Sequence, residues 1–179
     1  LRIEIIEADM EGTTELLLSG AVEGGIVYDF GRVHDLAFDP LFSAAPHVIL
    51  AADHPLADRA EIALADLAES ELGLLDLPHS REYFLGILED AGVAPRVRYS
   101  SHSYETVRSL VARGHGYSIL NQVPLAATTC DGGALRALPI AGEAPPLEVC
   151  FARVARVRPT ARTRAVAALA RELFGTDPR

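Results

Sequence analysis

The chain has 179 residues, of which 49% are hydrophobic and 6% aromatic, and this composition favours one large domain or two small lobes with an aliphatic core. The formal net charge of −9 argues against direct binding of nucleic acid, because an excess of Lys and Arg supplies the affinity for phosphates. The sequence contains no apolar run of membrane-spanning length and no signal-peptide pattern at its first residues. We therefore expect a cytoplasmic protein without membrane contacts.

The first third of the chain has the patterns of short strands around one helix. Residues 1–7 alternate apolar and charged side chains, which is typical of a strand. Asp9 is placed to cap a helix that ends at Gly20. The elements expected after this helix are strands at residues 25–28 and 46–52, a turn at 29–31, and helical turns at 53–57 and 64–68.

The remaining residues alternate strands with helices that begin at Ser or Thr. Ser80, Ser103 and Thr160 are each placed to cap a helix, because a hydroxyl oxygen can accept from the N–H groups of the first turn. The elements expected between these caps are strands at residues 72–77, 96–99, 117–120, 135–140 and 147–154, with a short helix at 124–129. Such alternation implies a mostly parallel sheet with crossover helices. The arginines near the C-terminus are interpreted as a solvated helix face and strand edge: Arg153, Arg156, Arg158, Arg162, Arg164 and Arg171.

Three segments, taken together in their order and spacing, carry a resemblance to a known family. Residues 7–26 contain E-A-D, E-L-L and S-G-A-V-E-G-G-I, residues 53–67 contain D-H-P-L-A and L-A-D-L, and residues 103–120 contain S-Y-E-T-V and L-V-A-R-G-H-G-Y-S-I-L. These segments resemble the effector-binding domain of LysR-type transcriptional regulators. Glu23 stands where that family usually has Asp, and Asn121-Gln122 stands where it often has Pro.

The resemblance implies an α/β fold of the type 2 periplasmic-binding-protein class, with two Rossmann-like lobes joined by a two-strand hinge. Residues 1–44 and 142–179 would form lobe I, residues 45–141 would form lobe II, and the first strand and helix of lobe I would precede Leu1. The implied function is to sense a small, anionic effector between the lobes. A winged helix-turn-helix domain, absent from this sequence, would make the only DNA contacts, and a homodimer or homotetramer is implied.

Candidate ligand contacts follow the predicted strands, because ligands of open α/β sheets bind outside the carboxyl ends of the strands. Helices that begin there offer N–H donors and a partial positive charge, which suit a carboxylate or phosphate. In lobe II the candidates are His79, Ser80, Arg81, Ser101, His102, Ser103, Asn121 and Gln122. In lobe I they are Met10 and Tyr28. For Ser80 and Ser103, an ordinary role as helix caps is an equally good explanation.

Several chemical classes have no signature in the sequence. It has no G-x-S-x-G, no H-E-x-x-H and no G-x-G-x-x-G after a strand, so no catalytic residue, metal site or cofactor is expected. Cys130 and Cys150 are expected to be free thiols, although a disulfide between them stays open. Two alternatives to a regulator domain also remain: a free-standing solute-binding protein of a transporter, and a dimerisation module that binds no ligand.

Overall fold

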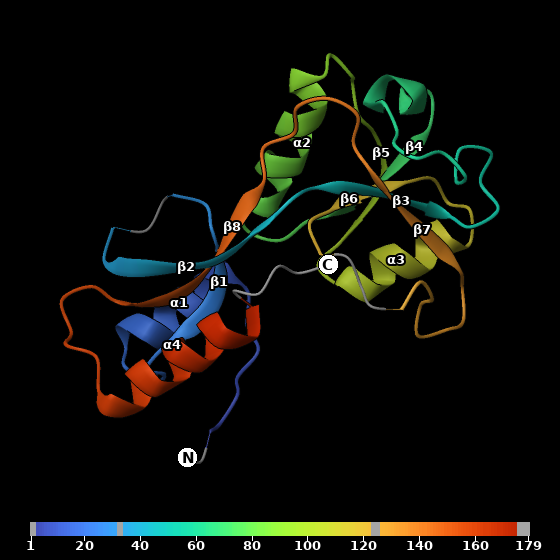
Figure 1. The fold of residues 1–179 in the computed structure, drawn as a ribbon. Coiled ribbons are helices and arrows are strands. Elements are labelled where there is room, and N and C mark those ends of the chain that lie inside the picture. Colours follow the sequence, from blue (N-terminus) through green and yellow to red (C-terminus); the bar gives the residue numbers. More distant parts are fainter. Residues whose placement is uncertain (1–2, 32–33, 123–125, 175–179) are drawn as a thin grey trace. The chain divides into compact units, whose positions relative to one another are not determined.

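The chain divides into two units, one of which is built from both ends of the sequence (Figure 1). The computed structural model describes residues 3–31, 34–122 and 126–174. Unit 1 consists of Leu1–Ala44 and Leu147–Arg179, and unit 2 consists of Ala45–Pro146. The two lobes assigned by family resemblance remain a prediction. Their second boundary lies between residues 141 and 142, whereas unit 2 ends at Pro146.

The sheet of unit 1 is antiparallel, and its central strand comes from the C-terminal part of the chain. The strands lie in the order β1 (Gly25–Asp29), β8 (Leu147–Val154) and β2 (Leu36–Ala44). Successive side chains of a strand point to opposite faces of the sheet. Ala152 of β8 therefore packs in a cluster with Leu17, whereas Phe151 packs in a cluster with Ala167.

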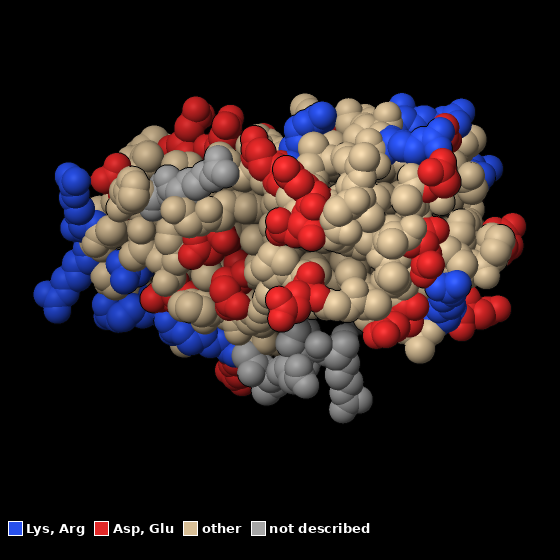
Figure 2. Space-filling model, turned by 90° about the horizontal axis from the view of Figure 1, so that it is seen from above, with Lys and Arg blue, Asp and Glu red and all other residues tan. Residues whose placement is uncertain are grey.

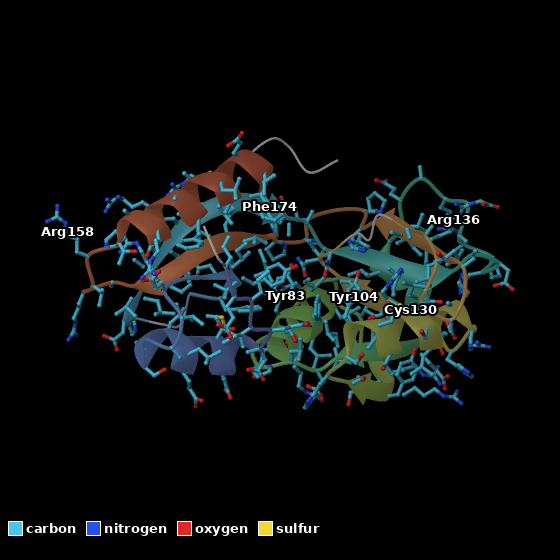
Figure 3. All side chains as sticks on the ribbon, turned by 90° about the horizontal axis from the view of Figure 1, so that it is seen from below. Tyr83, Tyr104, Cys130, Arg136, Arg158 and Phe174 are labelled. Carbon is cyan, nitrogen blue, oxygen red and sulfur yellow. The ribbon has the colours of Figure 1, made fainter. Side chains whose placement is uncertain are left out.

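Two helices cover the two faces of this sheet. Leu17 belongs to α1 (Met10–Leu18), and Ala167 belongs to α4 (Ala161–Phe174). Because their partners Ala152 and Phe151 are neighbours in β8, the two helices must lie on opposite sides, as Figure 3 shows. Both helices begin at predicted caps. Asp9 accepts from the N–H of Gly12 at 2.8 Å, and Thr160 accepts from the N–H of Thr163 at 3.1 Å.

The strands of unit 2 form one mixed sheet from two parts. One part is antiparallel and has the order β6 (Ser118–Leu120), β3 (His47–Ala51) and β7 (Leu135–Pro139). The other is the parallel pair β4 (Glu71–Leu75) and β5 (Arg96–Ser101). The two parts are joined at Tyr117, whose N–H donates to Glu71 O at 2.9 Å and whose carbonyl accepts from the N–H of Gly73 at 2.8 Å.

Gly116 makes this junction possible. Its φ of +98° lies in the region that favours glycine, and a Cβ at this position would lie only 2.0 Å from Glu71 O. A side chain at residue 116 would therefore separate the two parts of the sheet.

The core of unit 2 lies between this sheet and three helices. These are η1 (Leu64–Leu67), a 3-10 helix, α2 (Ser80–Asp90) and α3 (Tyr104–Ala112). All five residues of β3 are buried, as predicted for an apolar strand covered on both faces. The other side chains with 0% exposure in this core come from all three helices and the loop before η1: Ile62, Leu67, Leu88, Val107 and Val111. Burial of each such side chain contributes about 1.5–3 kcal/mol.

Several backbone predictions were wrong. Residues 3–9 do not form a strand, because no neighbouring strand in the described part of the chain pairs with them, and Ile5 is 87% exposed. The sheets are mostly antiparallel: among the described ladders only β4–β5 is parallel. Residues 126–129 contain no helix, and the rest of the helix predicted at 124–129 lies outside the described residues.

Strand β2 was not predicted at all. Pro40 lies in its middle, and proline is normally excluded from strand interiors. The strand accommodates it because β2 is at the edge of the sheet and the register shifts between Pro40 and Phe42. The same edge position explains why the missing N–H of Pro40 costs little.

Candidate functional site

The ends of β4 and β5 lie side by side and place two of the predicted candidate segments together. In the parallel ladder, Leu75 is the partner of Ser101. One residue further on, the N–H of Asp76 donates to Ser101 O at 3.0 Å. The loop that leads into α2 and the loop that leads into α3 therefore start from adjacent points, as expected for the carboxyl ends of parallel strands.

The loop between β4 and α2 is shaped by His79 and Ser80. His79 is the only non-glycine residue with positive φ (68°) in the described part of the chain, and it occupies the N-cap position of α2. Ser80, predicted to be the cap, is instead the first residue of the helix. Its buried hydroxyl accepts from the N–H of Leu77 at 3.0 Å and lies 3.1 Å from Leu75 O. The predicted capping role of Ser80 was wrong, because its side chain closes the loop behind it.

Arg81 has a partner inside the chain. Its Nη1 lies 2.9 Å from Asp76 Oδ2, and both side chains are partly exposed. The charge that opposes the helix dipole at the start of α2 is thus balanced by a carboxylate at the end of β4. An ion pair this exposed contributes only about 0–1 kcal/mol.

The loop between β5 and α3 has the predicted cap. Ser103 Oγ accepts from the N–H of Thr106 at 3.3 Å, and Ser101 Oγ accepts from the N–H of Ser103 at 3.1 Å. Both serine hydroxyl groups are thus used to order the loop. His102, between them, is exposed.

The end of β6 is tied to both helices by two tyrosines. The Nδ2 of the buried Asn121 donates to the Tyr83 hydroxyl at 2.9 Å, and the Tyr104 hydroxyl donates to Gln122 O at 2.8 Å. Tyr83 belongs to the first turn of α2 and Tyr104 begins α3. Figure 3 shows both rings at the ends of their helices. The two tyrosines bring all three predicted unit 2 segments to one edge.

Neither tyrosine was predicted to be a site residue. Tyr83 fits the apolar spacing of α2, so its pattern predicts only a core position. The available signal was a tyrosine within three residues of each loop serine, since a buried or half-buried Tyr needs a partner for its hydroxyl. The Tyr83 hydroxyl also donates to Pro145 O at 2.7 Å, just before the chain leaves unit 2.

The two candidates of unit 1 form a separate set. Met10 is the first residue of α1 and packs against the cluster around Leu17. Tyr28 lies in β1, with its ring centroid 6.3 Å from that of Phe30, and burial raises the pKa of its hydroxyl.

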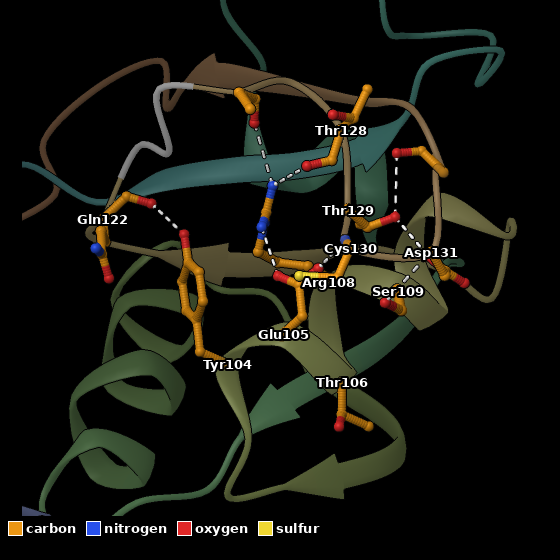
Figure 4. Close-up of polar contacts among 12 residues, drawn as sticks. Tyr104, Glu105, Thr106, Arg108, Ser109, Gln122, Thr128, Thr129, Cys130 and Asp131 are labelled. Carbon is orange, nitrogen blue, oxygen red and sulfur yellow. Dashed lines mark hydrogen bonds and ion pairs between the residues drawn. The ribbon is translucent and has the colours of Figure 1, made fainter. Parts of the chain in front are cut away.

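A buried arginine and its carboxylate partner contact residues 126, 128 and 130 (Figure 4). Arg108 of α3 is 6% exposed and donates to Glu105 at 2.5 Å and to Thr128 O at 3.0 Å. Glu105 in turn accepts from the N–H of Cys130 at 2.5 Å. Beside them, the pKa of the Asp131 carboxyl falls to about 2, mainly through the Thr129 hydroxyl and then through Arg113.

Glu105 and Arg113 also line an open hollow of about 440 Å³ along α3, whose other lining residues are Ser103, Thr106, Ser109 and Leu110. Only Ser103 is shared with the candidate edge. In the described residues no group of three or more His, Cys, Asp or Glu side chains is arranged to hold a metal ion, and both Cys130 and Cys150 are free thiols. None of the described helices has the length and hydropathy to cross a membrane.

Residues 1–175 match the family described as the LysR substrate binding domain. The chain belongs to this family. The resemblance of residues 7–26, 53–67 and 103–120 is thereby confirmed, as is the fold class that it implied.

The relatives of this chain are transcription regulators. It is 32% identical over 126 residues to the HTH-type transcriptional regulator TtuA of Agrobacterium vitis, a match that covers 62% of this chain and 41% of TtuA. It is 34% identical over 82 residues to the DNA-binding transcriptional dual regulator OxyR of Escherichia coli K12, covering 45% of this chain and 27% of OxyR. The chain thus spans less than half the length of these relatives.

Solved structures agree with the fold. The C-terminal domain of a probable LysR family regulator from Rhodococcus sp. RHA1 superposes with a TM-score of 0.86 at 33% identity, covering 92% of this chain and 81% of that one. HinK, a LysR family regulator from Pseudomonas aeruginosa, superposes with a TM-score of 0.89 at 28% identity, covering 94% of this chain and 59% of HinK. These matches favour a regulator domain over the transporter protein that the sequence left open.

Proposed function

We propose that this chain is the effector-sensing part of a cytoplasmic LysR-type regulator and binds a small anionic metabolite without transforming it. The observation that carries this proposal is the convergence of the ends of β4, β5 and β6 on one edge of unit 2. The helices α2 and α3 both begin at that edge. Their N-terminal N–H groups and partial positive charge favour a carboxylate or phosphate there.

The side chains at this edge add to the preference for an anion. His79, Arg81 and His102 all lie within the two loops, and the exposed ion pair between Arg81 and Asp76 is weak enough to open for a ligand. We assign Met10 and Tyr28 of unit 1 to the same effector on family resemblance alone.

We extend this proposal to the whole regulator, in which sensing and DNA binding belong to different domains. The acidic chain contributes sensing, and a DNA-binding domain elsewhere in the protein makes the contacts to the promoter, as the names of TtuA and OxyR imply for those proteins. Effector binding favours one of two conformations, and a dimer or tetramer transmits the change to that domain.

A thermal-shift screen of the purified chain tests the proposal. The probes are small aliphatic carboxylates, aromatic acids, sugar phosphates and amino acids, because a ligand of the native state must raise the unfolding midpoint. At least one anionic probe should raise it, and Arg81→Gln and Ser103→Ala should each raise its Kd by roughly fivefold or more. The matched control is Arg136→Gln, which removes an exposed arginine of β7 in the same unit.

Two results would overturn the proposal. One is the absence of any midpoint shift across all four classes of probe. The other is a probe whose affinity is lowered equally by Arg136→Gln and by Arg81→Gln, since that pattern indicates nonspecific attraction to positive charge.

A further inference from the structure

A second hollow lies in unit 1, beside α4, and its lining is rich in arginine. It has a volume of about 260 Å³ and is lined by Asp39, Phe151, Arg153, Pro159, Thr163, Arg164, Ala167 and Arg171. Although the chain as a whole carries a net charge of −9, arginine side chains gather over unit 1, at the left of Figure 2. The sequence pattern predicted a solvated helix face here, whereas the structure places three of these arginines around one concave surface.

The sheet and the helix each contribute part of the lining. Asp39 of β2 is the ladder partner of Phe151, and Arg153 lies two residues further along β8, so all three side chains share the face that α4 covers. Arg164 and Arg171 are seven residues apart in α4 and therefore lie on one side of the helix.

The hollow has more positive than negative charge. Asp39 is the one carboxylate in its lining, and it is shared by Arg171 Nη2 at 3.3 Å and Arg153 Nε at 3.8 Å. Arg164 has no carboxylate partner among the contacts of the described residues; its Nη1 donates to Pro159 O at 2.8 Å. The lining thus contains three guanidinium groups and one carboxylate, which leaves a surplus of two positive charges.

The hollow is also partly apolar. The side chains of Phe151 and Ala167 form its apolar wall, and they are 3% and 6% exposed, respectively. Guanidinium groups bind carboxylates and phosphates through paired hydrogen bonds, and the apolar wall suits a hydrocarbon body attached to the anion. Small-molecule sites combine an apolar lining with a few polar groups that orient the ligand, and this hollow contains both kinds of group.

We propose that this hollow is a second binding site, for a small organic anion with an aromatic or aliphatic body. The anion binds to Arg164 and Arg171 and competes with Asp39 for Arg153 and Arg171. All of its lining belongs to unit 1, so the site is distinct from the candidate edge of unit 2 and does not depend on the proposed function.

The test uses the purified chain with phenylphosphate and inorganic phosphate as probes. Binding is measured by isothermal titration calorimetry and by the NMR shifts of the Arg Nε–Hε groups. At the hollow, followed through the Nε–Hε shifts of Arg164 and Arg171, phenylphosphate should saturate and should bind more tightly than inorganic phosphate, because only the former has an apolar body. Combined Arg164→Gln and Arg171→Gln substitution should weaken phenylphosphate by roughly tenfold or more.

Two further variants make the proposal falsifiable even if the double variant is unstable. Asp39→Asn removes only the competing carboxylate and should tighten phenylphosphate binding several-fold. Arg158→Gln removes the same charge from an exposed arginine that lies outside the hollow (Figure 3) and should leave the Kd within about twofold, as screened surface charges do.

The site would be overturned by nonsaturable binding, by equal weakening with Arg158→Gln, or by weaker binding after Asp39→Asn. Equal affinity for the two probes would show that the apolar wall does not contribute to binding, and this result would also contradict the proposal. Ser103→Ala, at the candidate edge of unit 2, should not change the affinity for phenylphosphate, which separates the two sites.

Discussion

The hydroxyl of Tyr83 connects Asn121 to Pro145. It accepts from Asn121 Nδ2 at 2.9 Å and donates to Pro145 O at 2.7 Å. One side chain on α2 thereby links the end of β6 to the last residues of unit 2 before β8. A ligand that broke either hydrogen bond would therefore change the contacts of Pro145, close to the point where the chain leaves unit 2.

Tyr83→Phe should lower the free energy of unfolding by roughly 1–2 kcal/mol, because two hydrogen bonds are lost. Urea denaturation measures the change. The matched control is Tyr99→Phe: within the described residues the Tyr99 hydroxyl is buried and has no hydrogen-bond partner, so its removal should be neutral or stabilising. Equal destabilisation by the two substitutions would contradict the role assigned to Tyr83.

His47 should make the protein less stable in mild acid. Burial lowers the pKa of His47 from 6.5 to about 4, with a smaller opposing contribution from Ala45. Between these values the unfolded chain binds a proton that the native chain does not, so stability is present above pH 6.5 and is lost as the pH falls towards 4. The loss is on the order of 3 kcal/mol at most.

Urea denaturation of the native chain and of His47→Gln at about pH 7 and about pH 4.5 measures this dependence. The native chain should lose more stability than the variant over that interval. Parallel losses in the two proteins would show that other groups cause the acid sensitivity.

Gly116→Ala should destabilise unit 2 by roughly 2–4 kcal/mol, because the residue has positive φ and its Cβ would clash with Glu71 O. Gly86→Ala is the matched control. Gly86 lies inside α2, and a methyl group added there would meet no atom within 4 Å beyond the adjacent backbone of the helix, so alanine should stabilise the helix by up to about 1 kcal/mol. Thermal unfolding measures the stability of both variants. A change of the same sign in the unfolding midpoints of the two variants would contradict the role assigned to Gly116.

Cys130 should react slowly with iodoacetamide although it is exposed. The adjacent Glu105 raises the pKa of the Cys130 thiol, first through a hydrogen bond and then through its charge, so less thiolate is present at about pH 8. Glu105→Gln should accelerate the modification several-fold. Cys150 should stay unmodified in the native chain, because burial raises the pKa of its thiol to about 11.

Glu82→Gln, which neutralises an exposed carboxylate at the start of α2, is the control for this rate. It should leave the alkylation of Cys130 unchanged. Acceleration by this substitution to the same extent as by Glu105→Gln would attribute the effect to the net charge of the chain.

Much of the fold could be predicted because its signals are local. Asp9, Ser103 and Thr160 cap helices where expected, since a cap depends only on the side chain and the first turn that follows. Ser80 has the same sequence signature, yet its hydroxyl bonds to the loop before it. The positive φ of His79 turns the chain into the helix one residue earlier than a serine cap would.

The errors arose where pairing between distant segments decides the structure. Residues 3–9 have the alternation of a strand but no paired neighbour in the described residues, whereas β2 contains Pro40 and is a strand because β8 pairs with it. The direction of pairing is equally invisible in a single strand, so the antiparallel sheets could not be read from periodicity.

The candidate edge was predictable from strand ends and helix starts, but its contacts were not. The pair between Arg81 and Asp76 and the bond between Asn121 and Tyr83 depend on side-chain orientation across 5 and 38 residues, respectively. Sequence spacing identifies which residues can meet at the edge, and packing decides which of them do.

The central position of β8 has a consequence for the order in which the chain can fold. Among the described residues, β1 and β2 pair only with β8, so neither has a partner until Val154 has been synthesised. Unit 2 is continuous, and the ribosome completes it before β8 emerges. Strands β1 and β2 therefore stay unpaired after their synthesis, while unit 2 is already free to fold.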